Sequence, residues 1–337
     1  MCGILPPDPA LSRGSADEYM LGHASSTTLG LRMKRLRYIT IGLLFTCAAC
    51  ACAQIPSSRE EGVSVKNAAG LQLLIAEDSV QPRLRIILPG RARLDRAIEV
   101  LFPEHVSAIK SGSSLVEHLY LSSSATSEDR PFWRRIERSL EYERDLPRDI
   151  HLLAQATLED DGVRFHYEFT NRSAVAYDMI YAVTDPRLTS IFHDVRLERT
   201  YVHHADGFDL LASETPGRLT MPIAQWLPAR YLASFTWPVP TQRVEHRDDG
   251  ITYYNKSRAV DQPFIATVST DGAWVVASFA RETGNVWSNP ELTCQHVDPQ
   301  TSLLPGQHAT LEVKILILHS SLEDALQRAI RQRESLK

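Results

Sequence analysis

The stretch HLLAQATL-EDDG-VRFHYEFT, residues 151–170, decides the fold. Apolar and polar residues alternate on both sides of an acidic four-residue turn that ends in Gly162. Because successive side chains of an extended chain point to opposite faces, this pattern predicts two strands that each bury one face. The turn residues between them predict a β-hairpin.

Similar apolar runs of strand length lie on both sides of this hairpin. The segment 132–140 fits a helix or a strand equally well. Short strands at intervals of about 8–12 residues, joined by Gly, Asp and Asn turns, predict an antiparallel sandwich or barrel. The further strands are expected at 71–76, 83–88, 97–102, 115–121, 177–183, 201–202, 208–211, 264–269, 274–280 and 309–318.

One helix is expected, at the C-terminus. Ser320 and Glu323 fit a capping box, and Leu322, Leu326 and Ile330 form one apolar stripe. The predicted fold is therefore all-β, a large antiparallel β-sandwich in a single domain, residues 68–337, with a C-terminal helix.

The leader predicts export. The basic segment MKRLR at 33–37 precedes an apolar run at 39–51 that is too short for a membrane anchor, and ACA at 51–53 fits signal peptidase cleavage before Gln54. We therefore expect an over-extended start at 1–32, a signal peptide at 33–53 and a flexible spacer at 54–67. The protein is expected to be periplasmic or extracellular. A lipid anchor at Cys50 or Cys52 is the alternative to cleavage.

The charge and the cysteine content limit which binding partners and which disulfides are expected. The chain has 36 Lys+Arg, 41 Asp+Glu and a formal net charge of −5, with no basic block, so nucleic acid is not an expected partner. Beyond the signal peptide no run is long enough to cross a membrane. Four of the five cysteines lie in the leader, which leaves Cys294 alone and predicts no internal disulfide.

The stretch WSNPELTCQHVDPQTSLLPG, residues 287–306, gathers the chemically capable side chains. If 291–297 is extended, Cys294, His296 and Asp298 share one face. These residue types could bind a metal, but no second cysteine supports that, and neither a metal nor another cofactor is expected. A structural role, with His296 bonded to Asp298 to fix a turn, is favoured over the metal. A third interpretation is catalytic, because a His–carboxylate pair can move a proton.

Other candidates surround this stretch. Trp287 and Trp237 lie in proline-flanked segments, where aromatic rings can bind sugars or cover the end of a core. With Asn289 and His203 they form the predicted ligand-binding set. Asp185-Pro186-Arg187 could place a carboxylate and a guanidinium in one loop, but Asp-Pro is also a common turn opener.

Several motifs together mark a resemblance: TNRS at 170–173, ERTYV at 198–202, SNP at 288–290, CQHVDP at 294–299 and LPG at 304–306. The chain resembles a group of secreted bacterial β-sandwich proteins and, more distantly, the galactose-mutarotase-like supersandwich, over about residues 71–318. That resemblance implies sugar recognition and, in epimerases, a His acid with a carboxylate base.

The sequence therefore favours a carbohydrate-interacting protein that binds a saccharide near His296, Asp298 and Trp287. If it is catalytic, His296 would transfer a proton and Asp298 would orient it. The alternative is a non-enzymatic structural or interaction module.

Overall fold

A computed structural model describes residues 63–76, 81–90, 97–120, 130–213, 231–236, 252–255, 258–288 and 293–337. All of them belong to one compact unit, Ser58–Lys337. Almost all regular structure in this described part is β-strand, and all strand pairs are antiparallel except one.

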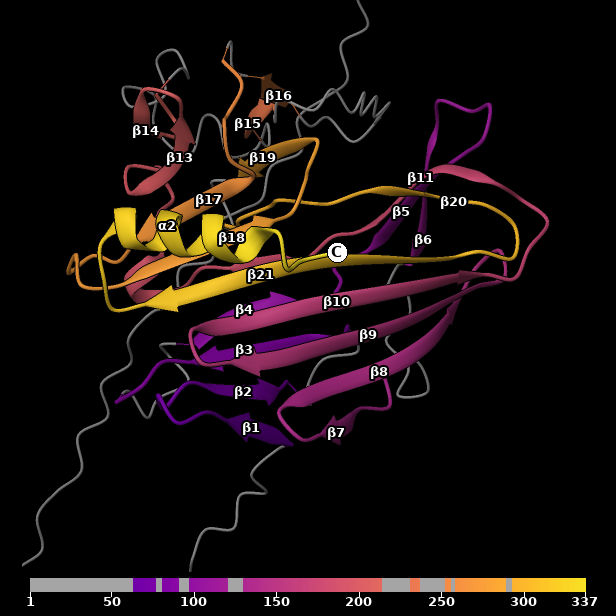
Figure 1. The fold of residues 1–337 in the computed structure, drawn as a ribbon, viewed down its shortest axis with the longest axis horizontal. Coiled ribbons are helices and arrows are strands. Elements are labelled where there is room, and N and C mark those ends of the chain that lie inside the picture. The colour runs from indigo at the N-terminus through magenta and orange to yellow at the C-terminus, as the bar shows by residue number, and fades with distance from the viewer. Residues whose placement is uncertain are drawn as a thin grey trace, which may run out of the picture. The chain divides into compact units, whose positions relative to one another are not determined.

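The largest sheet is built around the predicted hairpin, whose strands are β9 (Ile150–Glu159) and β10 (Gly162–Asn171). Buried and partly exposed residues alternate strictly along β9, as its sequence pattern predicts. The sheet has nine strands in the order β14-β13-β17-β18-β21-β10-β9-β8-β7 (Figure 1). The other seven strands are β7 (Arg134–Ile136), β8 (Ser139–Leu146), β13 (Thr200–His204), β14 (Gly207–Leu210), β17 (Phe264–Val268), β18 (Val275–Ala280) and β21 (His308–Leu318).

Three smaller sheets complete the described part. The first has the order β1-β2-β3-β4-β12, the second β20-β11-β5-β6, and the third β16-β15-β19. Their strands are β1 (Ser64–Lys66), β2 (Gln72–Ile75), β3 (Arg83–Ile87), β4 (Ala97–Leu101), β5 (Val106–Lys110), β6 (Val116–Tyr120), β11 (Tyr177–Ala182), β12 (Asp185–Arg187), β15 (Tyr231–Thr236), β16 (Thr252–Asn255), β19 (Asn285–Ser288) and β20 (Thr301–Leu303).

A shared core makes the sandwich. One hydrophobic cluster contains Leu73 and Val100 of the first small sheet, Ile180 of the second, and Leu152 and Phe165 of the large sheet. These sheets therefore bury their apolar faces against one another, which confirms the predicted all-β sandwich with its C-terminal helix. No helix among the described residues is long and apolar enough to cross a membrane.

Several boundaries differ from the sequence prediction. β1 (Ser64–Lys66) lies inside the range expected to be a spacer, because Val65 is buried in the core. β5 was not predicted as a strand. The ambiguous segment 132–140 forms β7 and the start of β8 rather than a helix.

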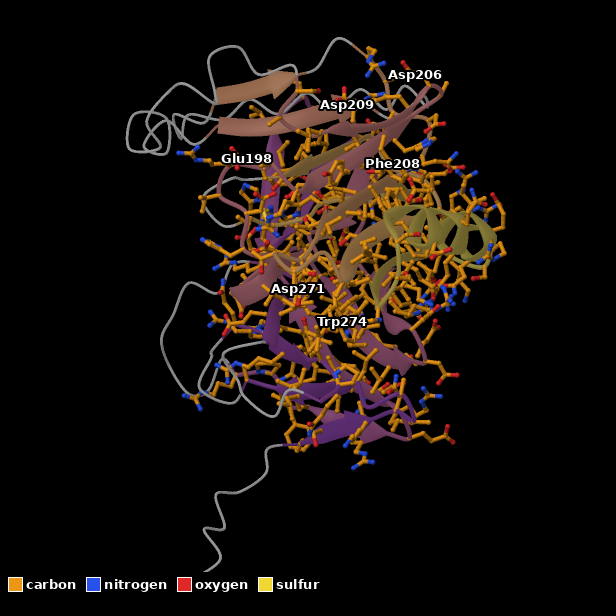
Figure 2. All side chains as sticks on the ribbon, turned by 90° about the vertical axis from the view of Figure 1, so that its left-hand side faces the viewer. Glu198, Asp206, Phe208, Asp209, Asp271 and Trp274 are labelled. Atoms are coloured by element: carbon orange, nitrogen blue, oxygen red, sulfur yellow. The ribbon has the colours of Figure 1, made fainter. Side chains whose placement is uncertain are left out.

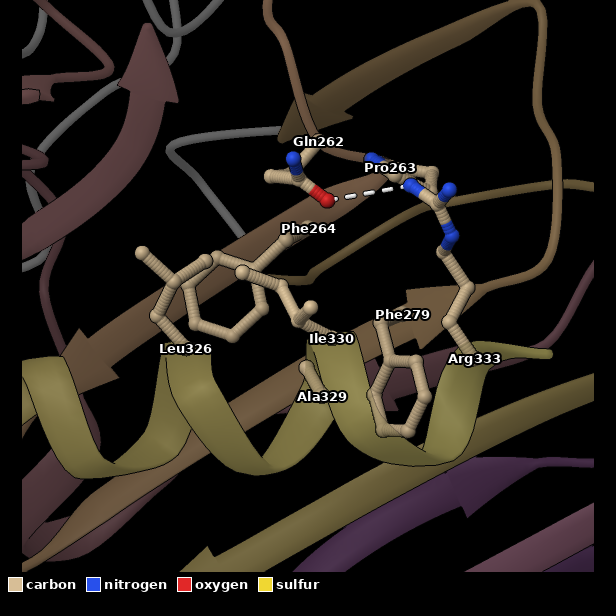
Figure 3. A pocket seen from close by; sticks show the side chains of 8 residues that line it. All are labelled: Gln262, Pro263, Phe264, Phe279, Leu326, Ala329, Ile330 and Arg333. Atoms are coloured by element: carbon tan, nitrogen blue, oxygen red, sulfur yellow. Dashed lines mark hydrogen bonds between the residues drawn. The ribbon is translucent and has the colours of Figure 1, made fainter. Parts of the chain in front are cut away.

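The C-terminal helix α2 (Leu322–Arg333) packs on the large sheet. Its buried Ala325, Leu326 and Ala329 join a cluster with Phe264 and Phe279. Figure 3 shows the shallow pocket that remains between them, where Arg333 donates to the side-chain oxygen of Gln262 (3.0 Å).

The helix begins one residue later than predicted. Its N-cap is Ser321, whose hydroxyl accepts from the backbone N–H of Asp324, and Asp324 bonds back to the N–H of Ser321. The box is therefore Ser321/Asp324 and not Ser320/Glu323. The carboxylate of the shorter Asp324 meets the Ser321 N–H at 3.4 Å.

We expect Ser321→Ala to lower the free energy of unfolding by about 1 kcal/mol, because it removes an N-cap acceptor. Ser320→Ala is the matched control, since among the described residues the Ser320 hydroxyl bonds just the carbonyl of Ser321, at 3.4 Å. Urea denaturation of both variants checks this. An equal loss in Ser320→Ala would contradict the assigned cap.

Candidate functional site

The candidate site lies where residues 293–298 pass between two strands. The backbone of His296 pairs with that of Trp287 on β19, through N–H···O bonds of 2.9 and 3.1 Å. Cys294 pairs with Arg187 on β12. These are isolated bridges, so the described part of the predicted extended segment 291–297 is held by two neighbours rather than by one continuous ladder.

The side chains still alternate as the sequence predicts. Cys294 and His296 point to the same side. Their ligand atoms lie within 4.8 Å of each other and of a carboxylate oxygen of Asp185. Between them, Gln295 points the other way and bonds Ser278 and Thr267. The structure therefore brings the predicted Cys294, His296 and Asp298 to one place.

His296 lies flat against Trp287. Their ring centroids are 3.7 Å apart and their planes differ by 7°. The indole Nε1 of Trp287 donates to Oδ2 of Asp298 (3.1 Å), and Nδ1 of His296 lies 3.7 Å from Oδ1 of the same carboxylate. Asp298 therefore accepts a hydrogen bond from the indole and lies beside the imidazole without one.

The other ring nitrogen of His296 faces a second carboxylate. Nε2 lies 3.5 Å from Oδ1 of Asp185. Arg187 donates from Nε to Oδ2 of Asp185 (2.7 Å) and from Nη2 to Glu104 (3.1 Å). The imidazole therefore lies between two carboxylates, one of which is held by a guanidinium.

Burial makes these charges interact strongly. His296 and Asp185 are each 1% exposed and Asp298 is 4% exposed. Burial by itself lowers the pKa of His296, but the neighbouring Cys294 and Asp298 raise it well above its ordinary value. Burial raises the pKa of Asp185, against the opposing effect of His296 and Arg187.

The pKa of Glu104 is also set by opposing effects, but unlike that of Asp185 it is lowered overall. Burial raises its pKa, but the hydrogen bond with His105 and the charges of His296, His105 and Arg187 lower it from 4.5 to about 2. Glu104 is therefore the ionised partner of Arg187 at neutral pH.

The remaining predicted site residues do not join this cluster in the described part of the chain. His203, on β13, bonds Asp261 (2.8 Å) and packs edge-on against Phe208 at 4.9 Å. Figure 2 shows Phe208 beside Asp206 and Asp209, separated from Trp274 and Asp271. Asn289 and Trp237 lie outside the described residues.

Sequence reasoning missed Asp185 and Arg187 as members of the site. The Asp-Pro-Arg motif was visible, but a turn was the simpler interpretation of it. In the structure, residues 185–187 instead form β12, paired with β4. Glu104 follows Pro103 and carries no sequence signal of its own.

Comparison with known proteins gives structural neighbours only. No family model matches the chain, and no curated protein matches it. A galactose mutarotase related enzyme from Lactobacillus acidophilus is 9% identical, with a TM-score of 0.44, over 77% of this chain and 98% of that chain. A putative aldose 1-epimerase from Escherichia coli K12 is 10% identical, with a TM-score of 0.42, over 76% and 98%.

A third neighbour is the α-N-acetylgalactosaminidase NagBb from Bifidobacterium bifidum, in complex with Gal-NHAc-DNJ. It is 10% identical, with a TM-score of 0.45, over 80% of this chain and 38% of that chain. At these identities and scores the neighbours assign no function to this chain.

Proposed function

We propose that this protein binds a saccharide by stacking it on Trp287. One face of the indole is covered by His296, and its N–H is held by Asp298. The side chain is nevertheless only partly buried. Part of Trp287 is therefore accessible to solvent, although His296 covers one face of its ring.

This geometry suits an aromatic binding platform. A ring that is fixed before the ligand arrives loses little conformational entropy on binding, and such rigid aromatic anchors contribute most to affinity. Aromatic rings present an apolar face of the kind that packs on the C–H face of a sugar, while polar groups nearby set its orientation. The preorganised and partly exposed Trp287 is the observation that carries the proposal, and the sequence resemblance leads to the same ligand class.

Proton transfer by His296 is the finer form of this proposal. A His between two carboxylates is equipped to move a proton. The imidazole is 1% exposed, so this chemistry requires the substrate to uncover it, whereas stacking on Trp287 does not. Binding is therefore the function that the geometry supports best.

A glycan array tests the binding. We expect the full chain to bind at least one class of saccharide on the array, neutral or acidic. The Trp287→Ala variant should not bind that class. If the wild-type chain binds neither class, saccharide binding is rejected and a structural or interaction module is favoured.

We also propose that the protein is exported, on the strength of the leader at 33–53. N-terminal sequencing of the protein expressed with its own leader in a bacterial host should read from Gln54. A blocked terminus with a lipid mass at Cys50 or Cys52 would show the alternative processing, and an intact leader on cytoplasmic protein would contradict export.

A further inference from the structure

Three buried side chains with metal-ligating atoms meet in the described part of the chain. The three residues are Asp185 on β12 and Cys294 and His296 from the 293–298 segment. Each offers one ligand atom, and these three atoms lie within 4.8 Å of one another. All three residues are buried, with at most 2% exposure. They come from segments more than 100 residues apart in the sequence.

A second observation points to a ligand at this place. Oδ1 of Asp185 is a buried carboxylate oxygen without a hydrogen-bond partner, whereas Oδ2 is satisfied by Arg187. Leaving a buried carboxylate oxygen unsatisfied is costly. This oxygen lies 3.5 Å from Nε2 of His296, so a buried atom without a hydrogen bond lies inside the three-residue cluster.

The distance between His296 and Asp185 suits a tetrahedral cation. Nε2 of His296 and Oδ1 of Asp185 are 3.5 Å apart. In a tetrahedral zinc site, a nitrogen and an oxygen ligand at their ordinary bond lengths are separated by about 3.3 Å. The Cys294 sulfur lies within 4.8 Å of both atoms, so it would move closer to complete the site.

The surrounding groups are those that orient metal ligands. A ligating histidine usually directs its other ring nitrogen to a carboxylate, and Nδ1 of His296 faces Asp298. Arg187 holds the second oxygen of Asp185 in the same way. Asp185 is therefore held in orientation by Arg187, and His296 has a carboxylate beside its other ring nitrogen.

The local charges also favour a cation. A thiolate, a carboxylate and a neutral imidazole sum to −2, which one divalent cation offsets. Arg187 and Glu104 neutralise each other beside it, and the Asp298 carboxylate near Nδ1 of His296 adds one further negative charge. A thiolate and an imidazole together select zinc-like cations rather than Mg²⁺ or Ca²⁺.

We propose that Asp185, Cys294 and His296 bind one divalent cation of the zinc class, as three of its ligands. The sequence alone favours a structural role without a metal, and it groups Asp298 rather than Asp185 with Cys294 and His296. In this proposal Asp298 orients His296 and does not bind the metal.

Cobalt titration of the full chain tests the site, because a thiolate bound to Co²⁺ gives a charge-transfer absorption. The background variant carries serine at Cys2, Cys47, Cys50 and Cys52, so Cys294 is its remaining thiol. We expect about one Co²⁺ per chain with a thiolate band, displaced by Zn²⁺. Cys294→Ser should abolish the band.

Variants identify the other ligands. Asp185→Asn and His296→Gln should each weaken Zn²⁺ binding by about 100-fold or more, since loss of a mere orienting group already costs about 10–100-fold. His166→Gln is the matched control, because His166 also bonds a carboxylate, Glu312 at 2.9 Å, but lies beside no cysteine in the described part. It should bind Zn²⁺ like the background chain.

Absence of a thiolate band in the folded background chain would overturn the proposal without any site variant. Equal weakening in His166→Gln would also overturn it. Neither result bears on saccharide binding, which is measured separately through Trp287.

Discussion

Lys314→Met is expected to lower the free energy of unfolding by about 3 kcal/mol, because it removes one partner of a buried ion pair. Lys314 lies on β21 and is 1% exposed. Its ammonium group donates to Oδ1 of Asp161 (2.7 Å), to Glu159 and to Gln332 (2.5 Å). Methionine fills a similar volume but leaves these acceptors without their cation. Urea denaturation measures the loss.

The same substitution should change the acid sensitivity. Burial raises the pKa of Asp161, but Lys314, Gln332 and Arg328 lower it below its usual 3.8. A carboxyl whose pKa is lower in the folded protein stabilises the fold above the unfolded value, and this contribution is lost as the pH falls through the folded value. Below about pH 4 the difference between wild type and Lys314→Met should therefore shrink.

Arg138→Gln is the matched control for an exposed pair. Arg138 donates to Asp160 (2.8 Å) in the same turn, but their side chains are 48% and 84% exposed. Such pairs contribute about 0–1 kcal/mol. If Lys314→Met were as mild as Arg138→Gln, the buried cluster would not stabilise the hairpin.

Gly162→Ala is expected to cost about 3 kcal/mol, at the upper end of the range for overpacking. A Cβ on Gly162 would lie 1.9 Å from the carbonyl oxygen of Ile315 and 3.0 Å from the Cα of Leu316. Both atoms are backbone of β21, which cannot move aside as a side chain can. The central pairing of β10 with β21 must therefore separate locally. Thermal unfolding measures the effect.

Gly112→Ala separates this clash from ordinary glycine strain. Gly112 has φ of +79° and no heavy atom within 4 Å of a built Cβ. Its substitution should cost about 1–2 kcal/mol, through the left-handed backbone alone. A Gly162→Ala variant as stable as the wild type would contradict the close approach of β10 and β21.

The hairpin was predictable because its information is local. Strict alternation along β9, and along β10 from Val163 onward, and the acidic turn between them suffice to define two strands. β5 was missed because Ser107 and Lys110 break the apolar pattern of a strand whose residues are mostly buried. Its burial comes from neighbouring sheets, which no local pattern encodes.

In the candidate site, too, one part was predictable from local sequence and another part was not. Spacing by two residues was enough to predict that Cys294, His296 and Asp298 converge, even without a continuous strand. The role of Asp185 depends on β12 lying beside residue 294, more than 100 positions away. A single sequence does not contain that neighbourhood, so the carboxylate that completes the cluster came only from the structure.

In the proposed function, Trp287 is a binding platform beside His296 and Asp298. The most direct test of this platform is a titration of the Trp287→Ala and Trp274→Ala variants with a saccharide that the wild-type chain binds on the array. The two tryptophans are matched, since Trp274 is also partly buried and also packs on a histidine, His319, edge-on at 5.0 Å. We predict about 30-fold weaker binding for Trp287→Ala, the loss typical of a truncated aromatic anchor, and unchanged binding for Trp274→Ala. Wild-type affinity in a folded Trp287→Ala variant would contradict the account.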